Sequence, residues 1–284
     1  MTEPLNPDLL EHAANLISQA DALIVAAGAG MGVDSGLPDF RGKEGFWKAY
    51  QALGREQADF HRIACPEVFQ TQPKRAWGFY GHRLNLYRTT QPHSGFEILK
   101  RWGDAMPQGY AVFTSNVDGQ FQRAGFDQAA ITECHGSIHH LQCLTPCRNS
   151  IWSADEFAPE VDADQCLLLN VMPTCPHCRG MARPNVMMFN DWDWLEHRQA
   201  EQAARLERWL SGVSRPVVVV EIGAGTAIPS VRRFSQRIIH EFGGRLVRIN
   251  PREYSVPSNL DVGLASGTSH ALAETDRVMR APLV

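Results

Sequence analysis

The sequence predicts an α/β protein with a doubly wound parallel sheet, interrupted by two insertions that form a smaller domain. Three observations predict this fold. Short apolar runs that suit buried parallel strands alternate with amphipathic stretches that suit helices. The chain has 284 residues, 44% of them hydrophobic, which is enough to bury a large core. Two segments lack the alternation, one rich in aromatic residues and one bearing cysteines, and they supply the smaller domain.

The strands and helices of the large domain follow from local pattern. A first helix is predicted at 7–20, because Leu10, Ala13 and Ile17 share one stripe and Asp8 lies near its start. Two more amphipathic helices are predicted at 194–210 and 229–242. The apolar runs predicted as buried strands are residues 23–27, 111–114, 217–222 and 246–249.

The two insertions are predicted to pack together as one small domain. Segment 46–87 is aromatic-rich and predicted to be helical, and segment 141–183 carries the paired cysteines. The large domain is then made of residues 1–45, 88–140 and 184–284. In sheets of this kind, ligands gather at the carboxyl ends of the strands.

Composition excludes several classes of protein. A net charge of −4 and a pI near 6.3 give no basic field, so nucleic acid is not implied as a partner. No signal peptide is recognisable at the start, and no apolar run approaches the roughly 18 residues that a membrane span needs. Seven cysteines, four of them in two close pairs, suit metal thiolates in a reducing compartment. We therefore expect a cytoplasmic protein without membrane contact.

A glycine-rich segment, Gly28-Ala29-Gly30-Met31-Gly32, follows the first predicted strand. Glycines at such a point let backbone N–H groups approach a phosphate closely. The same pattern also serves as a purely structural turn, so the spacing alone leaves both interpretations open.

Three motifs in order resemble those of sirtuins. The stretch 28–42, GAGMGVDSGLPDFRG, resembles their cofactor loop, and the segment 115–118, SNVD, resembles their Gln-Asn-x-Asp motif with Ser115 in place of glutamine. A His-Gly pair follows at His135 and Gly136. The resemblance covers about residues 20–267 and implies a Rossmann-like domain that binds NAD as co-substrate, together with a small zinc-binding and helical domain.

The resemblance also implies a set of ligand residues. It assigns Cys143, Cys147, Cys175 and Cys178 to one zinc ion, and four thiolates form a closed tetrahedral site, which makes the metal structural. The alternative for these cysteines is unliganded packing in a core. The residues implied to bind NAD are Gly28, Ala29, Gly30, Asp39, Phe40, Arg41, Ser115, Asn116, Asp118, Gly223, Gly225, Thr226 and Asn250.

An acylated lysine of a protein substrate is the second implied ligand. The segment 183–189, RPNVMMF, resembles the sirtuin strand on which the peptide adds, which places Val186, Met187 and Phe189 at the peptide. The chain departs from the family at Asn190-Asp191, so we expect the peptide groove to be narrower or built for a different peptide backbone. Tyr80 and Arg83 resemble the Tyr-x-x-Arg pair of desuccinylating and demalonylating sirtuins, and a guanidinium can bind a carboxylate through two hydrogen bonds.

The implied reaction transfers an acyl group from lysine to ADP-ribose and releases nicotinamide. Phe40 is expected to screen the reacting ribose carbon, Asn116 and Asp118 to hold ribose and carboxamide, and His135 to act as general base. Two alternatives stay open: an NAD glycohydrolase or ADP-ribosyltransferase using the same pocket, motivated by Ser115, Gly32 and the Asn190-Asp191 departure, and a non-catalytic NAD-sensing module.

Overall fold

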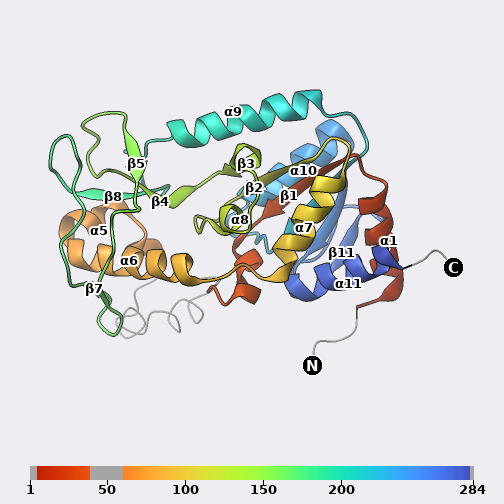
Figure 1. Cartoon of the computed structure of the whole chain (residues 1–284), viewed down its shortest axis with the longest axis horizontal. Helices are drawn as coiled ribbons and strands as arrows, with labels where there is room; N and C mark the ends of the chain where they lie inside the picture. The colour runs from red at the N-terminus through yellow and green to blue at the C-terminus, as the bar shows by residue number, and fades with distance from the viewer. Residues whose placement is uncertain (1–4, 39–59, 282–284) are drawn as a thin grey trace.

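The computed structural model describes residues 5–38 and 60–281 and contains the predicted parallel sheet (Figure 1). Its strands lie in the order β11-β10-β9-β1-β2-β3, and every neighbouring pair is parallel. The strands are β1 (Ala22–Ala27), β2 (Tyr110–Thr114), β3 (Ile131–Glu133), β9 (Val217–Ile222), β10 (Arg245–Ile249) and β11 (Val262–Leu264). The four predicted strands are confirmed, whereas β3 and β11 have only three residues each and were not predicted.

Helices cover both faces of the sheet. Alternate residues of β1 face two different cores, since Leu23 and Val25 pack in one and Ile24 in the other. The first core holds α1 (Pro7–Ser18), α7 (Ser94–Ala105) and α11 (Thr268–Arg280), and the second holds α9 (His197–Gly212) and α10 (Ser230–Phe242). The doubly wound arrangement is therefore confirmed. The three helices predicted in the large domain are present, with boundaries that differ from the predicted ones by at most three residues.

A third core belongs to the smaller layer beside the sheet. It contains α4 (Phe60–Ile63), α5 (Pro66–Thr71) and α6 (Pro73–Thr89), so segment 46–87 is helical over most of the part that the structure describes. These helices pack on an antiparallel sheet of order β5-β4-β8, formed by β4 (Gly136–Cys143), β5 (Ile151–Ser153) and β8 (Ala182–Val186), and on the hairpin of β6 (Val161–Asp162) and β7 (Leu167–Leu168). The exact domain boundaries stay a prediction.

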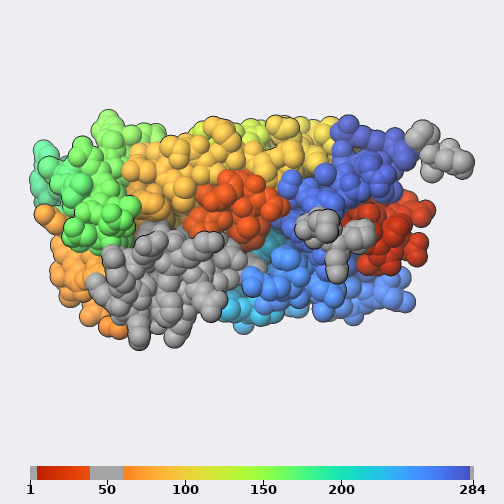
Figure 2. Space-filling view, turned by 90° about the horizontal axis from the view of Figure 1, so that it is seen from below, coloured from red at the N-terminus to blue at the C-terminus, as the bar shows by residue number. Residues whose placement is uncertain are grey.

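Short elements fill the connections: η1 (Ala29–Ser35), α8 (Gln120–Arg123) and η2 (Gln128–Ala130). The space-filling view shows an elongated molecule, with the small layer at one end and α1 near the other (Figure 2). Among the described helices, none is long and apolar enough to span a membrane.

The loops after β1 and β9 meet backbone to backbone. Gly223 has φ +59°, and a Cβ added there would lie 2.4 Å from the Cα of Gly30. The clashing atoms belong to the backbone, so a side chain at Gly223 would force one of the two loops to shift. This contact fixes the relative height of the two loops at the carboxyl edge of the sheet.

We therefore expect Gly223→Ala to lower the free energy of unfolding by about 2–4 kcal/mol, from left-handed backbone strain plus overpacking. Gly109→Ala is the matched control, because Gly109 has φ +69° with nothing within 4 Å of the added Cβ. It should cost only the backbone part, about 1–2 kcal/mol. Urea unfolding of both variants measures the difference, and equal losses would contradict a contact between the loops.

Candidate active site

One cavity of about 1100 Å³ opens at the carboxyl ends of β1, β2 and β9, between the main sheet and the small layer. Most residues predicted for ligand binding line it: Gly28, Ala29, Tyr80, Arg83, Ser115, Asn116, Asp118, His135, Val186, Met187, Phe189, Gly225, Thr226 and Asn250. Gly30 and Gly223 do not line the cavity, because they pack against each other. Asp39, Phe40 and Arg41 lie outside the described residues.

His135 lies on the turn between β3 and β4, and a glycine makes that turn possible. Gly136 has φ +79°, and a Cβ there would meet the carbonyl oxygen of Asn185 at 2.2 Å. The His135 Nε2 lies 3.2 Å from the Ser230 Oγ. Burial lowers the pKa of His135, an effect partly offset by a hydrogen bond to the backbone of Ser115. The ring is therefore neutral at neutral pH, the form that a general base requires.

Asn116 and Asp118 follow β2 and reach the glycine loop and the cavity. The Asn116 Nδ2 donates to the Gly28 carbonyl oxygen at 3.0 Å, which ties the two loops together. Asp118 is buried, and its Oδ1 accepts the backbone N–H of Gln120 at 2.9 Å. Burial raises the pKa of Asp118 to about 6, with a further rise from the charge of Glu133. Asp118 is thus a carboxylate at neutral pH and a hydrogen-bond acceptor in the cavity.

Tyr80 and Arg83 lie on α6, where the i, i+3 spacing brings both side chains to the cavity. The guanidinium carbon of Arg83 lies 5.3–5.6 Å from the ring centres of Phe79, Tyr80 and Tyr87. Its Nε donates to the Tyr87 Oη at 3.0 Å. Burial raises the pKa of Tyr80, so the phenol stays neutral. An aromatic box therefore holds a cation at this end of the cavity.

The end of β8 and the turn after it form another wall. The Met187 N–H donates to the His135 carbonyl at 2.9 Å, and the Phe189 N–H to Ala64 at 3.0 Å. Asp191, a residue of the departure from the sirtuin pattern, pairs with Arg183 through two hydrogen bonds of 2.7 Å. Both side chains are fully buried, 0% and 1% exposed. The buried ion pair of Arg183 and Asp191 therefore holds the turn after β8 in place.

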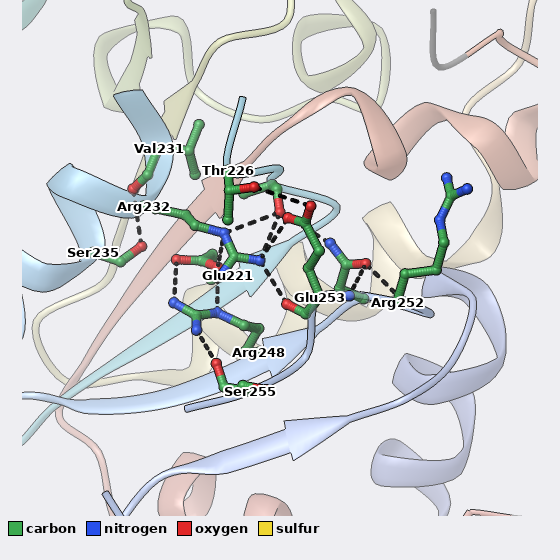
Figure 3. Close-up of polar contacts among 11 residues, drawn as sticks. Glu221, Thr226, Val231, Arg232, Ser235, Arg248, Arg252, Glu253 and Ser255 are labelled. Carbon is green, nitrogen blue, oxygen red and sulfur yellow. Dashed lines mark hydrogen bonds and ion pairs between the residues drawn. The ribbon is translucent and has the colours of Figure 1, made fainter. Parts of the chain in front are cut away.

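A polar network supports the opposite end, where β9 and β10 finish (Figure 3). The Asn250 Nδ2 donates to the Ala224 carbonyl at 2.9 Å, and its Oδ1 accepts the N–H groups of Arg252 and Glu253. The Thr226 Oγ1 donates to Glu253 at 3.1 Å. Asn250 therefore joins the two loops in addition to lining the cavity.

Beneath these loops lies a buried ion cluster that the sequence interpretation missed. Glu221 is 1% exposed, and its carboxylate accepts from the Arg248 Nε at 2.6 Å (Figure 3). Arg232 lies 4.0 Å from the same carboxylate and donates to Ala224 and Glu253. A glutamate inside the apolar run VVVVEI was the available signal, because a buried carboxylate needs a cationic partner.

The four paired cysteines converge where β4 ends and ahead of β8. The Sγ atoms of Cys143, Cys147, Cys175 and Cys178 all lie within 4.8 Å of one another. Two of the pairs, Cys143–Cys178 and Cys147–Cys175, are 3.6 Å apart. A tetrahedron with Zn–S bonds of about 2.3 Å has edges of about 3.8 Å, so the cluster can hold a zinc ion. All four positions would be protein ligands, which suits a structural metal.

Comparisons with known proteins agree with this geometry. The model of the Sir2 family matches residues 28–208. An NAD-dependent protein deacylase of Pyrococcus furiosus is 30% identical over 85% of this chain and 86% of its own, and NAD-dependent protein deacylase 2 of Pyrobaculum aerophilum is 30% identical over 88% of each.

Solved structures show the same fold. A Sir2 homologue in complex with NAD has a TM-score of 0.73, at 23% identity over 95% of this chain and 93% of its own. A second structure of a Sir2 enzyme has a TM-score of 0.71, at 21% identity over 97% and 99%. With a family match over residues 28–208 and relatives at 30% identity along most of the sequence, this chain belongs to the Sir2 family.

Proposed function

We propose that the protein removes acyl groups from lysine side chains of proteins, with NAD as co-substrate, and that it favours acidic acyl groups. The observation that carries the proposal is the position of His135. Its neutral ring lies in a cavity whose lining runs from Asn250 at one end to the boxed cation Arg83 at the other. Relatives named NAD-dependent protein deacylases support the reaction class.

In this proposal the two ends of the cavity have separate roles. Loops after β1, β9 and β10, with Gly28, Ala29, Gly225, Thr226 and Asn250, bind the nucleotide, while Ser115, Asn116 and Asp118 hold the nicotinamide ribose. Val186, Met187 and Phe189 bind the peptide backbone and the acylated lysine. The acyl oxygen attacks the ribose carbon as nicotinamide leaves. His135, assisted by Asn116, then takes the proton of a ribose hydroxyl, whose oxygen attacks the acyl carbon.

The zinc ion would be held by the four cysteines and would supply no chemistry, because a closed thiolate site leaves no open position. The predicted cytoplasmic location and the lack of an implied nucleic-acid partner remain part of the proposal.

The proposal is tested by nicotinamide release from NAD with matched acetyl-lysine and succinyl-lysine peptides and without peptide. Peptide-dependent release that is faster for succinyl-lysine is the expected result. Equal release without peptide would instead indicate an NAD glycohydrolase, and no release with any acceptor would favour an NAD-sensing module.

The acyl preference rests on Arg83, which we expect to bind the distal carboxylate. Replacing it by methionine should lower kcat/KM for succinyl-lysine about ten- to hundredfold, the worth of one charge-assisted hydrogen-bonding pair. The acetyl-lysine rate of the same variant is the control, because acetyl carries no carboxylate. A similar loss for both peptides would remove Arg83 from acyl recognition, and Arg83→Lys separates charge from the two-pronged geometry.

A further inference from the structure

His135 is in contact with the first residue of α10. The Ser230 Oγ lies 3.2 Å from the His135 Nε2, and both side chains line the cavity. Ser230 is not part of any motif quoted from the sequence, and it is only partly buried. The inference drawn from this contact rests on the proposed function, because it concerns the general base of that reaction.

The partner of the second ring nitrogen of His135, Nδ1, determines which nitrogen carries the hydrogen in the neutral ring. The ring is also hydrogen-bonded to the backbone of Ser115, and this bond favours the charged ring, so the carbonyl oxygen is the acceptor. With Nε2 engaged by Ser230, the carbonyl is left for Nδ1, and this pairing assigns the hydrogen of the neutral ring to Nδ1. In the neutral ring Nε2 then has a free lone pair. Ser230 must donate its hydroxyl hydrogen to it.

The position of Ser230 at the beginning of α10 adds a second effect. This helix runs for 13 residues and begins at Ser230, so the ring lies close to its amino end. The amino end of a helix carries a partial positive charge, which opposes a second positive charge on the imidazole. Contact with this end and donation by the hydroxyl both favour a neutral ring.

We propose that Ser230 is the positioning residue of His135: its hydroxyl donates to Nε2 and so holds the ring with Nδ1 protonated and with the Nε2 lone pair toward the cavity. When NAD is bound, a ribose hydroxyl takes the place of Ser230 at Nε2. The proton of that hydroxyl passes to Nε2, its oxygen keeps the electron pair, and the Nδ1–H remains on the Ser115 carbonyl.

The test compares Ser230→Ala with Ser230→Thr in the full chain. We expect Ser230→Ala to lower kcat/KM for NAD in the deacylation reaction about tenfold, because the contact belongs to the NAD-free enzyme, and Ser230→Thr to restore most of it. Because the hydrogen bond to the neutral ring is lost, the pKa of His135 should rise in Ser230→Ala by about half to one pH unit. The acid limb of the pH profile should move up with it.

Two readouts keep this inference separate from the reaction class. Titration of His135 followed by NMR in the NAD-free protein reports its tautomer and its pKa without any turnover, so it applies even if the protein is not a deacylase. The other titratable groups lining the cavity are His61, Tyr80, Arg83, Tyr87, Asp118, Arg252 and Glu253, and none of them is changed by the substitution.

Ser235→Ala is the matched control on the same helix. The Ser235 Oγ donates to the Val231 carbonyl (Figure 3), so its hydrogen bond is made inside α10 and not to His135. It should leave the activity and the titration of His135 as they are in the parent protein. The inference is overturned if Ser230→Ala leaves both the activity and the pKa of His135 unchanged. It is also overturned if the alanine and threonine variants lose activity equally while the pKa of His135 does not change.

Discussion

Replacing His135 by asparagine is expected to lower kcat/KM for NAD-dependent deacylation about 10²- to 10⁴-fold, the range that a positioned general base contributes. Asparagine retains an amide of similar size that can still bond to Ser230, so the turn at Gly136 and the cavity wall should persist. Binding of NAD, measured by calorimetry, should change little. A matching loss of NAD affinity would instead mean that His135 holds the nucleotide.

The pH dependence follows from the same groups. Burial holds the pKa of His135 below its ordinary value, so the base is lost only as pH falls through that lowered pKa. Asp118 has a pKa of about 6, so it loses its charge as the pH falls through about 6. Both effects act in one direction: kcat/KM should be flat near neutral pH and fall below about pH 6, with the loss of the His135 base adding to the fall at lower pH. In His135→Asn, the remaining activity should show only the Asp118 limb.

The fold was predictable wherever the pattern was long enough. The run VVVVEI and the amphipathic stripe of α1 each fix an element and a buried face. Strands β3 and β11 have three residues each, and no periodicity can be read from so few. Their positions are set instead by pairing with β2 and β10, a tertiary effect.

The site was predictable through motifs and missed where function depends on folding at a distance. The resemblance to sirtuins identified His135, Asn116 and Asp118, and all three line one cavity. It also identified Gly30 and Gly223, which do not line the cavity because they pack against each other. Ser230 approaches His135 across 95 positions of sequence. No local pattern in the chain indicates such a pair.

Loss of the zinc ion is expected to separate peptide binding from NAD binding. The ligands Cys175 and Cys178 precede β8, which begins at Ala182 and leads directly into the cavity wall at Val186 and Met187. In contrast, the loops at the nucleotide end follow β1, β9 and β10 of the main sheet, which has its own cores. Without the metal, the β4–β8 layer should loosen while this sheet stays folded.

Cys175→Ser tests this expectation. Cys175 is 1% exposed, and without its thiolate the site should lose zinc and at least about 4 kcal/mol of stability, since structural zinc sites supply folding energy directly. We expect zinc content near zero, faster amide exchange in β4 and β8, a peptide KM at least tenfold higher, and an almost unchanged Kd for NAD. Cys65→Ser is the control, because the Cys65 Sγ lies 3.2 Å from the Arg62 carbonyl and outside the cluster, a contact that serine can keep. Equal weakening of peptide and NAD would show that the small layer and the sheet fold as one unit, and the separation of roles along the cavity would have to be abandoned.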